Sequence, residues 1–120
     1  MHPLSPNVSD LVKLQQDYAL AKAKLILWIN EQGWKVTEGE GHVALTDAKD
    51  GDHDGPHRKD GGHYKALATD LNLWVNGALI KDGTHPAWAQ IHRYWRSLHP
   101  AAGTIPHDMN HIAFRHAGVL

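Results

Sequence analysis

The sequence contains no cysteine. Disulfide bonds and thiolate metal sites are therefore excluded, and any bound metal ion would have to be held by histidine, aspartate or glutamate. No stretch comes near the roughly 18 continuous apolar residues of a transmembrane helix, so we expect no insertion into a membrane. Residues 1 to 10 lack a cationic region followed by an apolar one, so we expect no secretory signal peptide.

An excess of charge of either sign is also missing. The chain carries 12 Lys and Arg residues against 13 Asp and Glu residues, with a formal net charge of -1. Proteins that bind nucleic acid usually carry a basic excess, so we expect no nucleic-acid partner. A length of 120 residues suits one domain with a hydrophobic core. We therefore expect residues 1 to 120 to form a single domain, with residues 1 to 8 flexible, and a monomer.

The first third of the chain predicts a helix followed by a short strand. Six apolar residues recur at helical spacing between residues 9 and 32, namely Leu11, Leu14, Tyr18, Leu25, Trp28 and Ile29. Ser9 suits the N-cap of this helix and Gly33 suits the position after its end. Residues 34 to 38 resemble a strand, and residues 39 to 62 form a long polar connection of the kind that often carries function.

The second half predicts a hairpin, a second helix and a last strand. Residues 66 to 75 read as a strand, and Asn76-Gly77 is a strong hairpin signal before a partner strand over residues 78 to 81. A second helix is expected to begin at Thr84 or His85, with Pro86 in its first turn, and to end before Pro100. Its apolar face consists of Trp88, Ile91, Trp95 and Leu98. With a short strand over residues 112 to 114, the pattern predicts one α+β domain.

Histidine is unusually abundant, with 11 residues. In the strand over residues 66 to 75, alternate side chains share a face, so two alanines are expected beside Asp70 and Asn72. Small side chains next to a carboxylate leave the space that a metal ion, a water molecule and a substrate need. His63 precedes the strand and can lean over the alanines toward Asp70. These two residues are the first candidate metal ligands.

A catalytic zinc ion usually has three protein ligands and one open position. His111 is the best third candidate, and Asp108 lies three positions before it. A spacing of three points two side chains to opposite faces of a regular strand, so we expect Asp108 on a turn that curls back, helped by Asn110. Zn²⁺ would then be held by His63, Asp70 and His111, while Asp108 acts as general base toward water. The alternative from spacing alone is a set of scattered surface histidines.

These residues also carry a resemblance to a known family. The segment His63-x2-Ala-Leu-Ala-Thr-Asp-Leu-Asn-Leu-Trp resembles the zinc-binding segment of the M15 family of peptidoglycan peptidases, and the match to its phage-type branch covers His63, Leu67, Ala68, Asp70, Leu71, Asn72 and Leu73. The second motif of that family is an acidic residue, two others and a histidine, which Asp108-Met-Asn-His111 matches. The two motifs occur in the family's order, and the resemblance runs from about Leu25 to Phe114.

The resemblance implies a specific fold, site and activity. It implies a hedgehog- or DD-peptidase-like α+β domain, in which helices flank an antiparallel sheet that holds zinc. It implies that His63, Asp70 and His111 are the zinc ligands and that Asp108 is the catalytic base. The implied activity is that of a phage endolysin, a zinc metallopeptidase that degrades the bacterial cell wall by cutting the L-alanyl-D-glutamate bond of peptidoglycan. D-Ala-D-Ala carboxypeptidase activity, also found in the family, is an alternative.

The chain departs from the family at one important position. Relatives carry an arginine at the position of Val43, often credited with holding substrate or the oxyanion, and no arginine precedes Arg58 here. Arg58, Lys49 or His42 are candidates for that role, and His57 or His107 are candidate contacts in the cleft. Because this cation has moved or is lost, a non-catalytic phage structural or wall-binding protein stabilised by zinc stays open as an alternative.

A nuclease of the His-Asn-His type is a further alternative, since Asp108-Met-Asn-His111 superficially suits it, but the neutral net charge speaks against it. Without a signal peptide, a wall-degrading enzyme of this kind would be made in the cytoplasm of the host bacterium. It would reach the wall after release through a holin, or as part of a phage particle. The sequence does not identify which peptide bond is cut.

Overall fold

A computed structural model describes residues 6–39 and 66–120. The described part is an α+β domain with two helices and an antiparallel sheet of five strands, as expected for the fold class. In chain order, the elements are α1 (Pro6–Glu31), β1 (Lys35–Glu38), β2 (Ala68–Val75), β3 (Ala78–Leu79), α3 (Pro86–Ser97), β4 (Ala102–Ile105) and β5 (Asp108–Phe114). The predicted polar connection over residues 39 to 62 lies outside the described residues except for Gly39.

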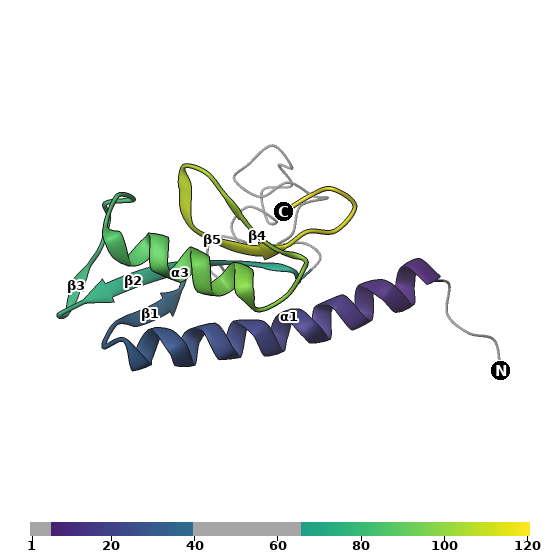
Figure 1. The fold of residues 1–120 in the computed structure, drawn as a ribbon, viewed down its shortest axis with the longest axis horizontal. Coiled ribbons are helices and arrows are strands. Elements are labelled where there is room, and N and C mark those ends of the chain that lie inside the picture. Colours follow the sequence, from purple (N-terminus) through teal and green to yellow (C-terminus); the bar gives the residue numbers. More distant parts are fainter. Residues whose placement is uncertain (1–5, 40–65) are drawn as a thin grey trace, which may run out of the picture.

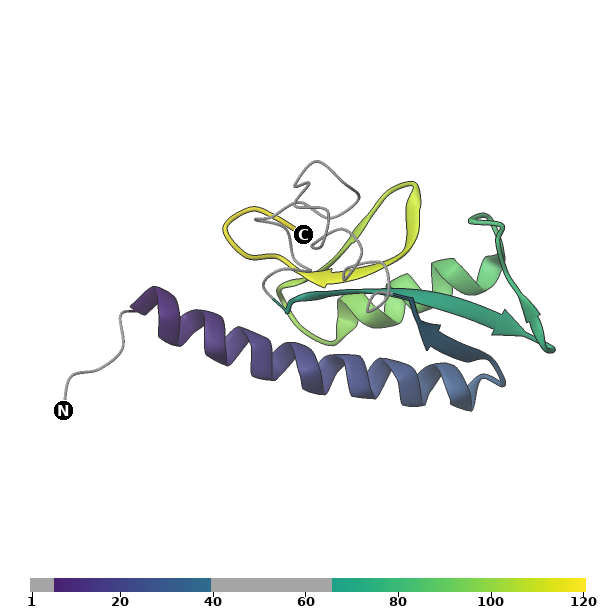
Figure 2. The same cartoon turned by 180° about the vertical axis from the view of Figure 1, so that it is seen from behind.

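Helix α1 runs below the sheet, and its first turns extend beyond the strands (Figures 1 and 2). Its buried residues Tyr18, Ala21, Leu25 and Ile29 follow the predicted helical stripe. The helix begins three residues earlier than predicted, at Pro6, which suits a first turn. It ends where expected: Gly33 has φ 88, and the Trp34 N–H donates to the Ile29 carbonyl at 3.2 Å. This is a Schellman cap, and it turns the chain directly into β1. None of the helices described has the length and apolar character to cross a membrane.

Strand β2 organises the sheet, whose order is β1-β2-β5-β4. Strand β1 occupies one edge of β2, and β5 pairs with the other edge through Ala68, Thr69 and Asp70. Strand β3 pairs with Trp74 and Val75, and Trp74 is already paired with β1 on its other side. Strands β3 and β5 therefore lie on the same edge of β2, separated by the stretch from residue 71 to residue 73.

The predicted hairpin joins β2 to β3. Asn76 has φ 52 and Gly77 has φ 80, the two left-handed positions of a type I′ turn. The alternation predicted for β2 is also present: Thr69, Leu71 and Leu73 are buried, while Asp70 and Asn72 are half-buried on the other face. Ala66 differs, because it has φ 56 and lies in a turn before the strand.

The C-terminal hairpin is larger than the sequence predicted. Instead of one short strand over residues 112 to 114, the chain forms β4 and a seven-residue β5. The register shifts between Thr104 and Ile105. Thr104 pairs with Ile112, but the next residue of β4, Ile105, pairs with Asp108. The turn before β5 contains His107 with φ 68, whereas Asn110 lies within the strand. The sequence did not predict the full extent of these strands because β4 contains Gly103 and β5 begins with mostly polar residues. Glycine, aspartate and asparagine do not favour strands.

Helix α3 begins as predicted. His85 caps it, its Nδ1 accepting from the Ala87 N–H at 3.1 Å, and Pro86 occupies the first helical position. Of the predicted apolar face, Trp88, Ile91 and Trp95 are buried, and the fourth residue, Leu98, is the half-buried C-cap. The helix therefore presents its aromatic stripe to the sheet.

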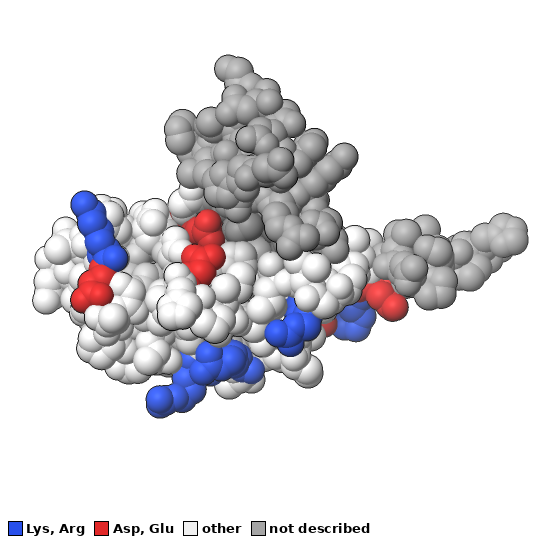
Figure 3. Space-filling model, turned by 90° about the horizontal axis from the view of Figure 1, so that it is seen from above, with Lys and Arg blue, Asp and Glu red and all other residues white. Residues whose placement is uncertain are grey.

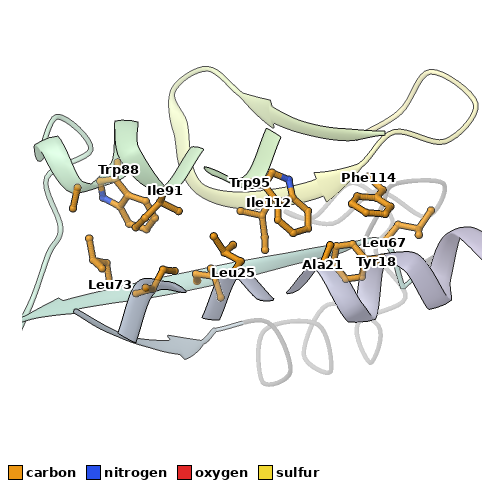
Figure 4. Packing of buried hydrophobic residues seen from close by; sticks show 13 residues of the cluster. Tyr18, Ala21, Leu25, Leu67, Leu73, Trp88, Ile91, Trp95, Ile112 and Phe114 are labelled. Atoms are coloured by element: carbon orange, nitrogen blue, oxygen red, sulfur yellow. The ribbon is translucent and has the colours of Figure 1, made fainter. Parts of the chain in front are cut away.

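Both helices contribute to one hydrophobic core (Figure 4). Trp88, Ile91 and Trp95 reach in from α3, while Tyr18, Ala21 and Leu25 reach in from α1. The Trp95 indole N–H donates to the carbonyls of Gly103 and Ala113, both at 3.2 Å, which ties α3 to the β4–β5 hairpin. The strand that carries His111 is thus held by a buried hydrogen-bonded indole.

Candidate functional site

Two of the three predicted zinc ligands lie opposite each other on neighbouring strands. Asp70 of β2 and His111 of β5 are register partners, and their side chains approach to 3.3 Å between His111 Nδ1 and Asp70 Oδ1. His111 is 4% exposed, whereas Asp70 is half-buried. The pair is built by alternation: residues on either side of Asp70 turn into the core, so Asp70 itself faces away from it.

The separation of these two atoms fits shared coordination of a metal ion. Two ligand atoms at about 2.1 Å from one zinc ion, at the tetrahedral angle, lie about 3.4 Å apart. The observed 3.3 Å is close to this value. The same distance also allows a hydrogen bond between the imidazole and the carboxylate. One imidazole and one carboxylate are also ligand types that zinc accepts, so the two residues fit the ion.

The other half of the predicted site lies outside the described residues. This applies to the third ligand, His63, and to the candidate substrate or oxyanion residues Arg58, Lys49, His57 and His42. Within residues 6–39 and 66–120, no group of three or more metal-ligating side chains comes together. The ligand trio therefore stays a prediction, of which the structure brings two members into contact.

Asp108 is the first residue of β5. The register shift lies between Asp108 and Ile112, so the regular pairing with β4 does not continue from one to the other. Three residues of β5 lie between the partners of Thr104 and Ile105, so the ladder between β4 and β5 is irregular at this point. The side chain of Asp108 lines a pocket of about 380 Å³, as does that of His107, which is exposed. The prediction that Asp108 lies on a turn formed with the help of Asn110 is therefore wrong: both residues belong to β5, and the turn lies just before it, at residues 106 and 107.

The pocket opens where the ladder between β2 and β5 ends. Asp70 and His111 form the last recorded pair of that ladder. The next residues along each strand, Leu71 and Asn72 on β2 and Asn110 and Met109 on β5, line the pocket. The pocket is also lined by Leu79 of β3, by Ile80, Lys81 and Gly83 after it, by Trp88 of α3, and by His107 and Asp108. The residues next to the two candidate metal ligands along their strands therefore line a pocket of about 380 Å³, while Asp70 and His111 are not among its lining residues.

His92 of α3 is hydrogen-bonded to the backbone between Asp108 and His111. It is 6% exposed, and its Nε2 lies 2.7 Å from the Met109 carbonyl oxygen. Because the carbonyl can only accept, Nε2 carries the proton and donates. Burial, the largest influence, lowers the pKa of His92, and nearby Arg96 acts in the same direction. The hydrogen bond to Met109 and the charge of Asp108 oppose this shift. A neutral His92 thus fixes the backbone between Asp108 and His111.

The sequence analysis did not identify Lys81 and Asn110 as lining residues of the pocket. Asn72 was detectable, since it shares a strand face with Asp70. Lys81 follows β3 and Asn110 lies in β5, so their meeting depends on how the two hairpins are placed, which no local pattern specifies.

The chain matches no protein-family model, no curated protein and no solved structure. The functional argument therefore depends on the geometry of Asp70, His111 and Asp108 and on the motifs in which they occur.

Proposed function

We propose that this chain is a zinc-dependent peptidase of the M15 type, which cuts the L-alanyl-D-glutamate bond in the stem peptides of bacterial peptidoglycan. The observation that carries the proposal is the contact between Asp70 and His111, whose strand neighbours Leu71 and Asn110 line the same pocket as Asp108. The two motifs that supply these residues, and their order along the chain, point the same way. The hedgehog- or DD-peptidase-like form of the α+β domain belongs to this proposal.

In this proposal Asp70 and His111 hold the ion together with His63. Zinc, when bound, would supply a Lewis acid that activates water and polarises the scissile carbonyl. Asp108 takes the proton of the attacking water on its carboxylate and returns it to the leaving amine. His92 holds the backbone between Asp108 and His111 in place through its hydrogen bond to the Met109 carbonyl.

The test is digestion of purified peptidoglycan with the zinc-loaded protein. We expect released muropeptide fragments whose masses show new L-alanine carboxyl and D-glutamate amino ends. Asp108→Asn should lower the rate by about 10²- to 10⁴-fold, the usual contribution of a general acid–base, while zinc content stays near one ion per chain. Asp10→Asn, the same exchange at an exposed position of α1, is the matched control and should leave the rate unchanged.

The alternatives give different results in the same assay. Fragments that have lost a terminal D-alanine would identify a carboxypeptidase. Zinc bound without any hydrolysis would indicate a structural or wall-binding protein, and nicked DNA would indicate the nuclease. On the face shown in Figure 3, basic side chains lie mainly along one margin and acidic ones lie between them, without the continuous basic surface that a nucleic-acid backbone requires. Release through a holin or carriage in a phage particle remains part of the endolysin proposal.

A further inference from the structure

We infer that the pocket between the β3 and β5 ends binds the leaving side of an acidic peptide, and that Lys81 recognises the carboxylate next to the scissile nitrogen. This inference rests on the proposed peptidase function and names the part of the substrate that the pocket accepts. It is carried by the position of the pocket, by the polar side chains that line it and by its charges.

The position of the pocket follows from the sheet. On the edge of β2 that carries β5 and β3, β5 pairs only as far as Asp70, and β3 pairs only from Trp74 onward. Along that edge, no described strand is registered with Leu71 or Asn72. Both residues line the pocket, so an extended peptide can lie along this unpaired stretch of the sheet edge, a common way for proteins to bind peptides.

The polar side chains of the pocket are free to bind a ligand. Within the described residues, no side-chain hydrogen bond or ion pair is recorded for Asn72, Lys81, Asp108 or Asn110, although all four line the same 380 Å³ pocket. A polar group that lies at a recess gains most from a partner when the protein itself supplies none. Together these side chains offer two amides, one ammonium group and one carboxylate.

Asp108 determines which side of the substrate enters. In the proposed mechanism this residue hands the proton to the leaving amine, and it lines the pocket. The residue that carries the leaving nitrogen must therefore lie at the pocket. In a D-glutamate linked onward through its side chain, the α-carboxylate stays free, and its carbon is about 2.5 Å from that nitrogen.

Among the lining residues of this pocket Lys81 is the one lysine or arginine, and it is exposed. It is not within ion-pair distance of Asp108, since the described residues include no salt bridge between them. A carboxylate that enters beside Asp108 would be repelled by that residue unless a cation offset the repulsion. Lys81, which lies between β3 and α3, supplies this cation.

Two probes that differ in one group test the inference. The first is D-γ-glutamyl-L-lysine amide, which carries the free α-carboxylate, and the second is its α-carboxamide analogue. Each is titrated into ¹⁵N-labelled full-length protein, both zinc-loaded and after chelation. We expect shifts of the Asn72 and Asn110 side-chain amides and of the Trp88 indole N–H, while the Trp28 indole, which does not line the pocket, stays unchanged.

The carboxylate probe should bind about two- to fivefold more tightly than the amide probe, the range typical of an exposed ion pair. Lys81→Met should abolish this difference, and Lys81→Arg should retain it. Lys24→Met, which removes an exposed lysine of α1, is the matched control and should behave as the wild type. High salt should shrink the preference in the wild type, because screening weakens exposed charge pairs.

The outcomes separate this inference from the proposed function. Equal binding of both probes, absence of binding, or an unchanged preference in Lys81→Met would overturn the role of Lys81, even if the protein cleaves peptidoglycan. Preference for the carboxylate probe that is lost in Lys81→Met supports the pocket assignment. If peptidoglycan nevertheless remains intact with the zinc-loaded protein, the peptidase proposal fails while the binding site stands.

Discussion

Replacing His92 with phenylalanine should destabilise the domain and loosen the segment that joins Asp108 to His111. The exchange keeps an aromatic ring in a buried position but removes the N–H that donates to the Met109 carbonyl at 2.7 Å. That carbonyl then loses its partner in a half-buried position. Leaving such an acceptor unsatisfied costs about 1–3 kcal/mol, and partial access to water favours the lower part of this range.

For a domain of this length, each kcal/mol corresponds to about 4 °C in melting temperature. We therefore expect His92→Phe to melt about 4–8 °C below the wild type when unfolding is followed by circular dichroism. His92→Gln should recover part of this loss, because its side-chain amide can donate to the same carbonyl. Zinc affinity, measured by competition with a chromophoric chelator, should follow the same order of wild type, Gln and Phe.

The reasoning would be refuted if His92→Phe melted within about 1 °C of the wild type, or if His92→Gln were no better than His92→Phe. The pH dependence provides a second check. Burial holds the pKa of His92 below its ordinary value of 6.5, so the unfolded chain takes up this proton more readily than the folded one. The free energy of unfolding should therefore fall as pH decreases from about 6.5 toward the lowered folded pKa. His92→Gln should remove this part of the pH dependence.

Three other perturbations follow from the fold. Tyr18→Phe removes the 2.6 Å bond from the Tyr18 hydroxyl to Thr69 Oγ1, and urea unfolding should show a loss of about 1–2 kcal/mol; no loss would contradict the bond. Gly77→Ala forces a β-carbon into φ 80, and the same assay should show a loss of about 1 kcal/mol, because the left-handed conformation strains L-residues. The pKa of Asp17 is lowered from 3.8, chiefly by its hydrogen bond from His99. The stability that the ionised carboxylate contributes is present above pH 3.8 and should be lost as the pH falls through the lowered folded pKa. The melting temperature of Asp17→Asn should therefore depend less on pH in this acid range than that of the wild type.

Local signals predicted much of the fold because they are encoded by neighbouring residues. The Asn76-Gly77 turn, the capped start of α3 at Pro86 and the end of α1 at Gly33 all depend on backbone preferences of one or two residues. Strand β4 escaped prediction because its pairing with β5 is set by tertiary contacts. The indole of Trp95, for example, bonds to carbonyls on both of these strands.

The candidate site was predictable only as separate parts. The strand pattern predicted which face Asp70 occupies, but its contact with His111 depends on the register between β2 and β5, which no local pattern specifies. The pocket depends on where that ladder stops and on how far β3 extends along the same edge. For this reason Lys81, eleven residues beyond Asp70 in the sequence, was not recognised as a lining residue of the pocket.

The most direct test of the metal centre is anomalous diffraction from crystals of the zinc-loaded protein, measured at the zinc absorption edge. We expect one strong peak about 2.0–2.2 Å from a carboxylate oxygen of Asp70 and from a ring nitrogen of His111, with His63 as the third protein ligand. A zinc peak away from Asp70 and His111, or none at all at full zinc loading, would contradict the account.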